Sequence, residues 1–260
     1  SVLVANAYYN TAFNYTITAS QNPTSYNATG LPIGLSINTT TGVISGSPTQ
    51  TGVFNATISA TNSAGTGSST LVITVNKGNQ TISFASIPSK TYGDSEFTLN
   101  ATASSSLPIT YTSSNPSVAT VSGNTVTVVG VGATTVVATQ SGDDNYNSAS
   151  AVTQELVVNK ANQTITFGTL TDKLDSDADF QLTATSSSGL PITYTSSNES
   201  VVLISGNTAS IVGPGTVTIT ASQGGNENYN AAIAVTQNQV IINTSLESQE
   251  ITFNALPAVT

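Results

Sequence analysis

Apolar side chains alternate with polar ones along most of this chain, and the alternation has the period of a β-strand. In the first quarter of the chain the pattern is clear at Phe13–Ala19, Phe54–Ala60 and Leu71–Val75. Thr, Ser and Asn lie between the apolar positions, and Gly or Pro turns separate the runs. A period of two residues predicts half-buried antiparallel strands, and no stretch has the spacing and caps of a helix. We therefore expect an all-β protein.

The later part of the chain is a tandem repeat. The sequence LPITYTSSN at Leu107–Asn115 returns 83 positions later at Leu190–Asn198. A fixed period that keeps hydrophobic, turn and aromatic positions indicates a copied folded unit, and this unit is long enough to bury its own core. The positions that keep the spacing include Phe84, Phe97, Gly123, Gly130, Gly132, Gln140, Tyr146 and Gln154, which recur as Phe167, Phe180, Gly206, Gly213, Gly215, Gln223, Tyr229 and Gln237.

The chain is predicted to contain three β-sandwich modules and the start of another. Residues 1–76 form module one, residues 77–159 module two, residues 160–243 module three, and residues 244–260 a linker and the first strand of a further module. Seven short strands with turns between them fit an immunoglobulin-like Greek key. In module two these strands are Thr81–Phe84, Phe97–Ala103, Ile109–Ser113, Val118–Val121, Thr125–Val129, Thr134–Thr139 and Ala151–Val158.

The linkers between modules are short. Asn76–Asn79 (NKGN) and Asn159–Asn162 (NKAN) have too few residues to act as flexible tethers, so neighbouring modules should nearly touch. The predicted fold class is all-β, with tandem immunoglobulin-like antiparallel β-sandwiches in an elongated array.

The last twelve residues, QEITFNALPAVT at 249–260, match the opening QTISFASIPSKT of module two. They are predicted to be a first strand that either begins a fourth module of a longer protein or completes a neighbouring chain by strand addition. The first interpretation is favoured because repeat arrays are routinely observed in part. Strand donation needs an open edge on module one, and Val2–Ala5 is available to fill that edge.

Sequence blocks in all three modules resemble bacterial surface repeats. Module one carries GLPIGLSI, TGVISGSPT and ATNSAGT within Ala28–Val75. This run resembles the immunoglobulin-like, cadherin-like repeats of large bacterial surface proteins, which implies a sandwich used for display or adhesion. The QTIxF, TYTSSNPSVATVSGNTVTVVGVG and GDDNYN blocks of the later modules resemble bacterial Ig-like repeats of the MBG and Big2 type.

Composition narrows the function. The chain has no His, Cys, Met or Trp and only four Lys plus Arg, so the usual general base and thiol nucleophile are absent and we expect no enzyme. A net charge of −9 argues against nucleic acid or an anionic membrane surface as partner. No apolar run approaches the roughly 20 residues that cross a bilayer. A cysteine-free chain rich in Ser, Thr, Asn and Gly is usual for extracellular or cell-surface repeat proteins.

The acidic residues cluster in loops that suggest calcium sites. In an immunoglobulin-like module the A–B loop lies at one pole and the F–G loop at the other. Asp94 and Glu96 of module two should therefore approach three residues of module three, Asn226, Glu227 and Asn228. Calcium favours six to eight such oxygen ligands. The other interpretation is that the acids are solvated and keep a weakly charged protein soluble. A second calcium candidate in module three comprises Asp175, Asp177 and Asp179.

Tyrosines and linker lysines are the remaining candidates. Tyr8 and Tyr9 cannot both face inward from one strand, so an exposed ring is expected there, and with Tyr92 they are candidate binding residues for a glycan or a protein. Each linker lysine is placed to pair with an acid of the following F–G loop, Lys77 with Asp143 or Asp144 and Lys160 with Glu227.

Together these features predict a structural segment of a large extracellular or surface-anchored bacterial repeat protein, acting as stalk, filament or adhesin shaft. Its expected partners are the neighbouring modules of the chain and, in a fibre, other copies of itself or a surface glycan or protein. The alternatives are a glycan- or protein-binding Ig-like module and an accessory region of a secreted enzyme.

Overall fold

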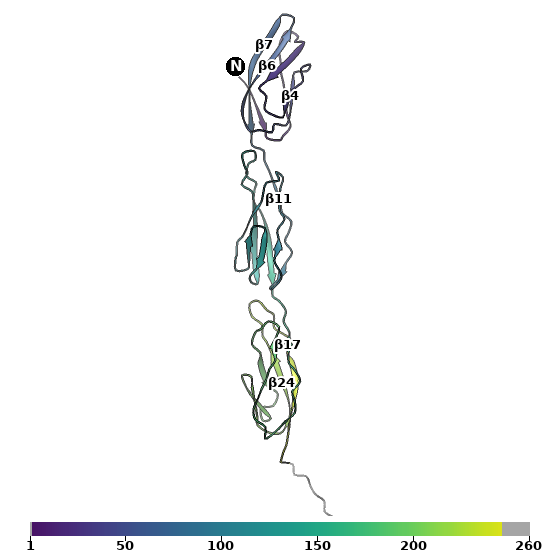
Figure 1. The fold of residues 1–260 in the computed structure, drawn as a ribbon, viewed down its shortest axis with the longest axis vertical. Coiled ribbons are helices and arrows are strands. Elements are labelled where there is room, and N and C mark those ends of the chain that lie inside the picture. Colours follow the sequence, from purple (N-terminus) through teal and green to yellow (C-terminus); the bar gives the residue numbers. More distant parts are fainter. Residues whose placement is uncertain (1, 246–260) are drawn as a thin grey trace, which may run out of the picture. The chain divides into compact units, whose positions relative to one another are not determined.

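β-strands are the only regular elements that the structure, a computed structural model, describes over residues 2–245 (Figure 1). They form tandem immunoglobulin-like β-sandwiches, each built from two layers of mainly antiparallel strands. The chain divides into two compact units. Within the described residues, no helix is long and apolar enough to cross a membrane. The first unit comprises Ser1–Ser89, Ser95–Val129 and Ala133–Val157, and the second comprises Lys90–Asp94, Gly130–Gly132 and the chain from Val158 onward.

Module one contains a four-stranded sheet in the order β1-β7-β6-β3 and a three-stranded sheet in the order β2-β5-β4. Its first and last strands pair in parallel, with Leu3 opposite Leu71 and Tyr8 opposite Asn76. The other pairs are antiparallel. The strands are β1 (Leu3–Tyr8), β2 (Phe13–Thr16), β3 (Ser25–Thr29), β4 (Leu35–Ile37), β5 (Val43–Gly46), β6 (Gly52–Asn62) and β7 (Gly65–Asn76).

Module two has the sheets β12-β15-β16-β9 and β10-β14-β13, and a separate pair, β11-β8. The opening segment of module two therefore pairs with two different sheets. β8 pairs with β11, and β9 then pairs in parallel with the last strand, β16. The strands are β8 (Ile82–Ser83), β9 (Lys90–Thr91), β10 (Phe97–Thr98), β11 (Thr102–Ala103), β12 (Thr110–Ser113), β13 (Ala119–Ser122), β14 (Thr125–Val128), β15 (Gly132–Thr139) and β16 (Val152–Asn159).

Module three repeats the plan of module two. Its sheets are β18-β25-β24-β21 and β19-β23-β22, with the separate pair β17-β20. Again the second short strand, β18, pairs in parallel with the last strand, β25. The strands are β17 (Ile165–Thr166), β18 (Lys173–Leu174), β19 (Phe180–Gln181), β20 (Thr185–Ser186), β21 (Thr193–Ser196), β22 (Val202–Ser205), β23 (Thr208–Ile211), β24 (Gly215–Ser222) and β25 (Val235–Ile242).

The predicted alternation of apolar and polar side chains identifies the residues of the hydrophobic core. Successive side chains of a strand point to opposite faces, so every second residue enters the space between the two sheets. In β24 these residues are Val217, Ile219 and Ala221, and none is more than 1% exposed. In β7 the predicted inward residues Leu71, Ile73 and Val75 are likewise buried in the core of module one.

Two details correct the strand predictions. Ala19 was expected to continue the inward alternation of its strand, but β2 ends at Thr16 and Ala19 is exposed. The stretch Phe97–Ala103 was expected to be one strand, yet it forms β10 and β11, which pair with different partners. In module two the break falls where the segment changes its pairing partner from β14 to β8, whereas in module one the chain bends at Ser20 and Gln21. The two-residue pairing of β9 carries no periodic signal that the sequence could reveal.

The buried aliphatic side chains of β24 should dominate the stability of module three. Replacing Ile219, which is 0% exposed, by Ala removes buried methyl groups and leaves a cavity, so we expect a loss of about 2–5 kcal/mol. Hydrogen exchange of the β24 amides, followed by mass spectrometry, measures the change in this module alone. The matched control is Ile233→Ala, because Ile233 is 89% exposed; equal acceleration in both variants would contradict the assigned core.

Candidate functional site

The candidate calcium ligands Asp94 and Asp177 close equivalent turns. Asp94 Oδ2 accepts a hydrogen bond from the Thr91 N–H at 2.9 Å, and the Asp94 N–H donates to the Thr91 carbonyl at 3.0 Å. Asp177 makes the same two bonds with Leu174 at 2.9 and 3.0 Å. Short polar side chains commonly stabilise turns in this way. Each carboxylate therefore has a local structural role directly after β9 or β18.

Glu96 and Asp179 form a second equivalent pair. Glu96 Oε1 accepts a hydrogen bond from Thr127 Oγ1 on β14, and Asp179 Oδ2 accepts one from Ser210 Oγ on β23, both at 2.7 Å. These bonds link the residue that precedes β10 or β19 to the neighbouring strand of the same sheet. Both carboxylates are exposed on that sheet.

Asn226 organises the F–G loop of module three. Its Oδ1 accepts the backbone N–H groups of Asn228 and Tyr229 at 2.8 and 2.9 Å. In module two, Asp143 Oδ1 accepts the equivalent two N–H groups, each at 2.8 Å. A neutral amide thus replaces a carboxylate in an otherwise identical turn. This turn therefore needs no negative charge, because the side-chain oxygen at this position only has to accept two N–H groups.

The predicted acids do not gather. Among residues 2–245, no group of three or more Asp, Glu, His or Cys side chains is placed to hold a metal ion. Glu227 is exposed, and Asp94 and Asp177 accept hydrogen bonds within their own turns. Calcium binding therefore stays a prediction. Among the candidate ligands, the carboxylates that accept hydrogen bonds within the chain are those of Asp94, Glu96, Asp175, Asp177 and Asp179.

The linker lysines do not form the expected carboxylate pairs. Lys77 Nζ donates to the backbone carbonyl of Asp143 at 2.6 Å, and Lys160 Nζ donates to the carbonyl of Asn226 at 2.7 Å. The prediction of pairing with the side chains of Asp143, Asp144 or Glu227 was wrong in its partner atom. The F–G loop presents backbone carbonyl groups to the linker, and the lysine ammonium group therefore bonds a carbonyl rather than a carboxylate.

The linker backbone also bonds the F–G loop. The Gly78 N–H donates to the Asn145 carbonyl at 2.8 Å, and the Gly78 carbonyl accepts the Asn147 N–H at 2.9 Å. This pattern is an isolated parallel bridge between Gly78 and Tyr146. It recurs between Ala161 and Tyr229, where the equivalent bonds measure 3.0 and 2.9 Å.

A tyrosine ring covers each of these bridges. Tyr9, directly after β1, packs edge-on against Tyr146 with ring centroids 5.1 Å apart, and Tyr92, directly after β9, packs against Tyr229 at 5.5 Å. Edge-to-face aromatic pairs of this kind contribute about 0.5–1.5 kcal/mol beyond the area they bury. Tyr8 is 50% exposed. The expectation of one exposed ring in the Tyr8–Tyr9 pair is therefore met by Tyr8, and ligand binding by these tyrosines stays a prediction.

Asp175 occupies the place of these tyrosines in module three. The backbone N–H groups of Tyr9, Tyr92 and Asp175 donate to Asn76, Asn159 and Ile242, the last residue of β7, β16 and β25 respectively. The Asp175 carboxylate accepts hydrogen bonds from Thr244, at 2.5 Å from Oγ1 and 3.1 Å from the N–H. These bonds, the hydroxyl foremost, hold the pKa of Asp175 below its ordinary value of 3.8.

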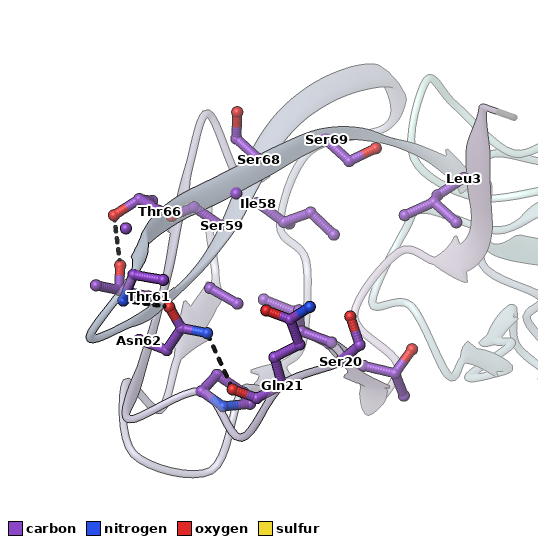
Figure 2. A pocket seen from close by; sticks show the side chains of 18 residues that line it. Leu3, Ser20, Gln21, Ile58, Ser59, Thr61, Asn62, Thr66, Ser68 and Ser69 are labelled. Atoms are coloured by element: carbon purple, nitrogen blue, oxygen red, sulfur yellow. Dashed lines mark hydrogen bonds between the residues drawn. The ribbon is translucent and has the colours of Figure 1, made fainter.

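A cavity at the top of module one was not predicted from the sequence (Figure 2). It has a volume of about 600 Å³ and lies between the loop that follows β2 and the β6–β7 hairpin. Leu3, Ile17 and Ile58 supply its apolar surface. Its polar surface comes from hydroxyl and amide side chains, including Ser20, Gln21, Ser59, Asn62, Thr66 and Ser69. The sequence carries no signal for it, because the alternation continues to Ala19 although β2 ends at Thr16.

Comparison with known proteins supports the fold of module one. Residues 1–76 match the family described as "Putative Ig domain". No protein of curated function matches the chain. The resemblance of the later modules to MBG and Big2 repeats stays a prediction.

Several solved structures match parts of this chain. A protein described as a putative alpha-galactosidase from Bacteroides fragilis is 35% identical over 29% of this chain and 16% of its own chain, with a TM-score of 0.28. Drosophila N-cadherin EC1-3 is 12% identical, with 94% and 99% of the two chains covered and a TM-score of 0.38. The immunoglobulin domains 1–4 of Sidekick-1 are 13% identical over 94% and 74% of the chains, with a TM-score of 0.29. The chain thus spans about a sixth of the length of the first of these.

The Thr244 hydroxyl should control the ionisation of Asp175. Because the folded pKa is depressed, the hydrogen bonds favour the native state at pH values above the ordinary pKa, and this contribution is lost as the pH falls through the lowered pKa. Thr244→Val should raise the pKa of Asp175 toward 3.8, as measured by carboxyl ¹³C NMR titration. Thr244→Ser keeps the hydroxyl and is the control; an unchanged pKa in Thr244→Val would show that the hydroxyl is not the cause.

Proposed function

We propose that this chain is a structural segment of a larger extracellular or surface-anchored protein, in which tandem Ig-like sandwiches serve as a stalk or adhesin shaft. The observation that carries the proposal is the repeated attachment of each linker to the F–G loop that follows it. Gly78 and Ala161 make the same pair of backbone bonds, and Lys77 and Lys160 donate to the same loop carbonyl. A linker built as a tether would need none of these contacts.

The contacts are numerous enough to restrict the linker. Net contributions of about 0.5–1.5 kcal/mol for each hydrogen bond add to the contribution of the tyrosine pair. At the first linker, Asn147 Nδ2 also donates to Asn79 Oδ1 at 2.9 Å, and Thr51 Oγ1 donates to the Asp144 carbonyl at 3.2 Å. Asn230 and Asn162 repeat the amide bond at the second linker at 2.8 Å. The same set of contacts restricts both linkers. This repetition supports a role that depends on the spacing between modules.

The strand order supports a load-bearing role. In each module the last strand pairs in parallel with a strand from the opening segment: β7 with β1, β16 with β9, and β25 with β18. When a module is pulled by its two ends, the hydrogen bonds between two parallel strands lie across the direction of pull and are loaded together. Unfolding then requires several bonds to break at once rather than one after another. This arrangement suits a shaft better than a module whose end strands peel apart.

Composition supports an extracellular place and a non-catalytic role. The chain has no cysteine and no histidine, and charged residues make up only 7% of it. Stability therefore comes from packing and hydrogen bonds that do not depend on the redox state of the surroundings. The exposed positions of the strands carry mainly Thr, Ser and Asn, whose hydroxyl and amide groups keep the sheets hydrated.

The linker contacts should make modules one and two tumble together. ¹⁵N relaxation of the whole chain should give similar rotational correlation times for amides of both modules, and the double variant Lys77→Met, Tyr146→Ala should shorten that of module one. Tyr8→Ala is the matched control, because Tyr8 is exposed and adjacent to Tyr9 in sequence. Separate correlation times in the unchanged chain would contradict the proposal.

A second measurement tests calcium. Small-angle scattering with calcium, and then with excess chelator, would reveal a calcium-stiffened shaft as a fall in maximum dimension after chelation. If the dimension stays constant while the double variant changes it, stiffness depends on the linker contacts and calcium is not required.

A further inference from the structure

In modules two and three, the opening segment crosses from one sheet to the other between its two short strands. The crossover is FASIPSK at 84–90 in module two and FGTLTDK at 167–173 in module three. The strand that follows, β9 or β18, pairs with the last strand of its module through two residues. The two copies can be compared position by position, whereas the further first strand predicted at 249–260 lies outside the described residues.

A buried glutamine of module three replaces a leucine of module two. Gln239 in β25 is 1% exposed, and Leu156, at the equivalent position of β16, is 0% exposed. Gln239 Nε2 donates to the carbonyl groups of Thr171 and Val240, each at 3.0 Å. Gln239 Oε1 is buried and has no hydrogen-bond partner within the described residues. The core of module three therefore contains a polar atom that the core of module two lacks at this position.

The amide of Gln239 gains nothing by turning over. The reversed orientation would place Oε1 against the carbonyl oxygens of Thr171 and Val240, which cannot donate a hydrogen bond. A buried acceptor without a donor costs free energy that the same atom does not cost in water. Thr171 belongs to the crossover, and its residues Leu170 and Lys173 line a hollow of about 240 Å³ beside Gln239. This cost is therefore removed when the crossover moves away and water reaches the amide.

The crossover of module three is also less restricted in sequence. Gly168 stands at the position of Ala85, and Thr171 stands at the position of Pro88. Gly168 does not need to be glycine, because its φ lies outside the left-handed region and no atom lies within 4 Å of an added Cβ. Glycine has more conformational freedom than alanine, and threonine more than proline, once a segment is detached. Both replacements therefore favour the detached state.

We propose that residues 168–172 and β18 form a release element, which detaches from β25 more readily than the equivalent segment of module two detaches from β16. Three differences act in the same direction. Gln239 disfavours the docked state, while Gly168 and Thr171 favour the detached state. β18 is the edge strand of its sheet, so its departure breaks no other strand pairing of that sheet.

The release element gives the array a defined point of yielding. The parallel pairing of β18 with β25 carries the load when module three is pulled by its ends, as the pairing of β9 with β16 does in module two. A weaker docking of β18 makes module three yield before module two, which spares the rest of the array. This mechanical use rests on the proposed shaft function, whereas the local detachment of β18 does not.

Hydrogen exchange of the whole chain, measured by NMR, tests the detachment. The Asp175 N–H donates to the Ile242 carbonyl at 3.0 Å directly after β18 and reports its docking. In the unchanged chain this amide should exchange faster than those of β24, with a rate that low denaturant concentrations leave constant, because the opening exposes little surface. Gln239→Leu should slow its exchange by about tenfold to a hundredfold. Ile233→Ala is the control and should change nothing, because Ile233 is exposed.

The reciprocal change tests module two. The Tyr92 N–H, which donates to the Asn159 carbonyl at 2.9 Å, is the equivalent reporter. Leu156→Gln should speed its exchange. If this variant does not fold, the double variant Ala85→Gly, Pro88→Thr tests the same point, because it changes only the crossover. In single-molecule pulling, the first unfolding event should come from module three and should shift to higher force in Gln239→Leu.

Two results would overturn the release element. One is an Asp175 amide that exchanges as slowly as those of β24 and with the same denaturant dependence, because module three then opens only as a whole. The other is unchanged or faster exchange in Gln239→Leu, which would make the two Nε2 hydrogen bonds a latch. Either result leaves the shaft function untouched. Separate tumbling of modules one and two would contradict the shaft function and leave the exchange of Asp175 unaffected.

Discussion

The parallel pairing of each module's last strand with a strand from its opening segment is the interaction on which the other features depend. It closes the larger sheet and, through one more hydrogen bond, fixes the residue that follows: Tyr9, Tyr92 or Asp175 donates its N–H to the end of the last strand. The tyrosine ring is thereby held over the start of the linker. There it meets Tyr146 or Tyr229 of the following F–G loop.

The F–G loop is built to receive the linker. Gly142 and Gly225 have φ values of +78°, in the left-handed region that favours glycine, and let the loop fold back on itself. Asp143 or Asn226 then closes the turn by accepting two N–H groups. This turn presents a carbonyl group to the linker lysine. The two linkers are thus joined to the modules after them by one mechanism.

Module three ends differently. Asp175 stands where the tyrosines stand, and it bonds Thr244 of the following segment rather than an aromatic ring. Asn243 replaces the linker lysine at the equivalent place after the last strand. A polar contact that depends on ionisation therefore substitutes here for an aromatic contact that does not. Module one differs at its other end, where the first strand runs beside β7 and leaves a cavity beside Ser20.

The sequence by itself determined the fold class, because burial of alternate side chains between two sheets imposes a period of two that is readable in β7 and β24. It also determined the repeat. It predicted that the A–B and F–G loops lie at opposite poles of a module, and this placement is required for Tyr92 in the A–B loop of module two to contact Tyr229 in the F–G loop of module three. The tertiary structure decided what the loop side chains bond. Lys77 faces a carbonyl oxygen and Asp94 faces its own turn, since hydrogen-bond partners in loops depend on backbone direction, which has no periodic signature. The cavity of module one was likewise beyond sequence reasoning, because β1 has the alternation of a strand whichever neighbour it pairs with.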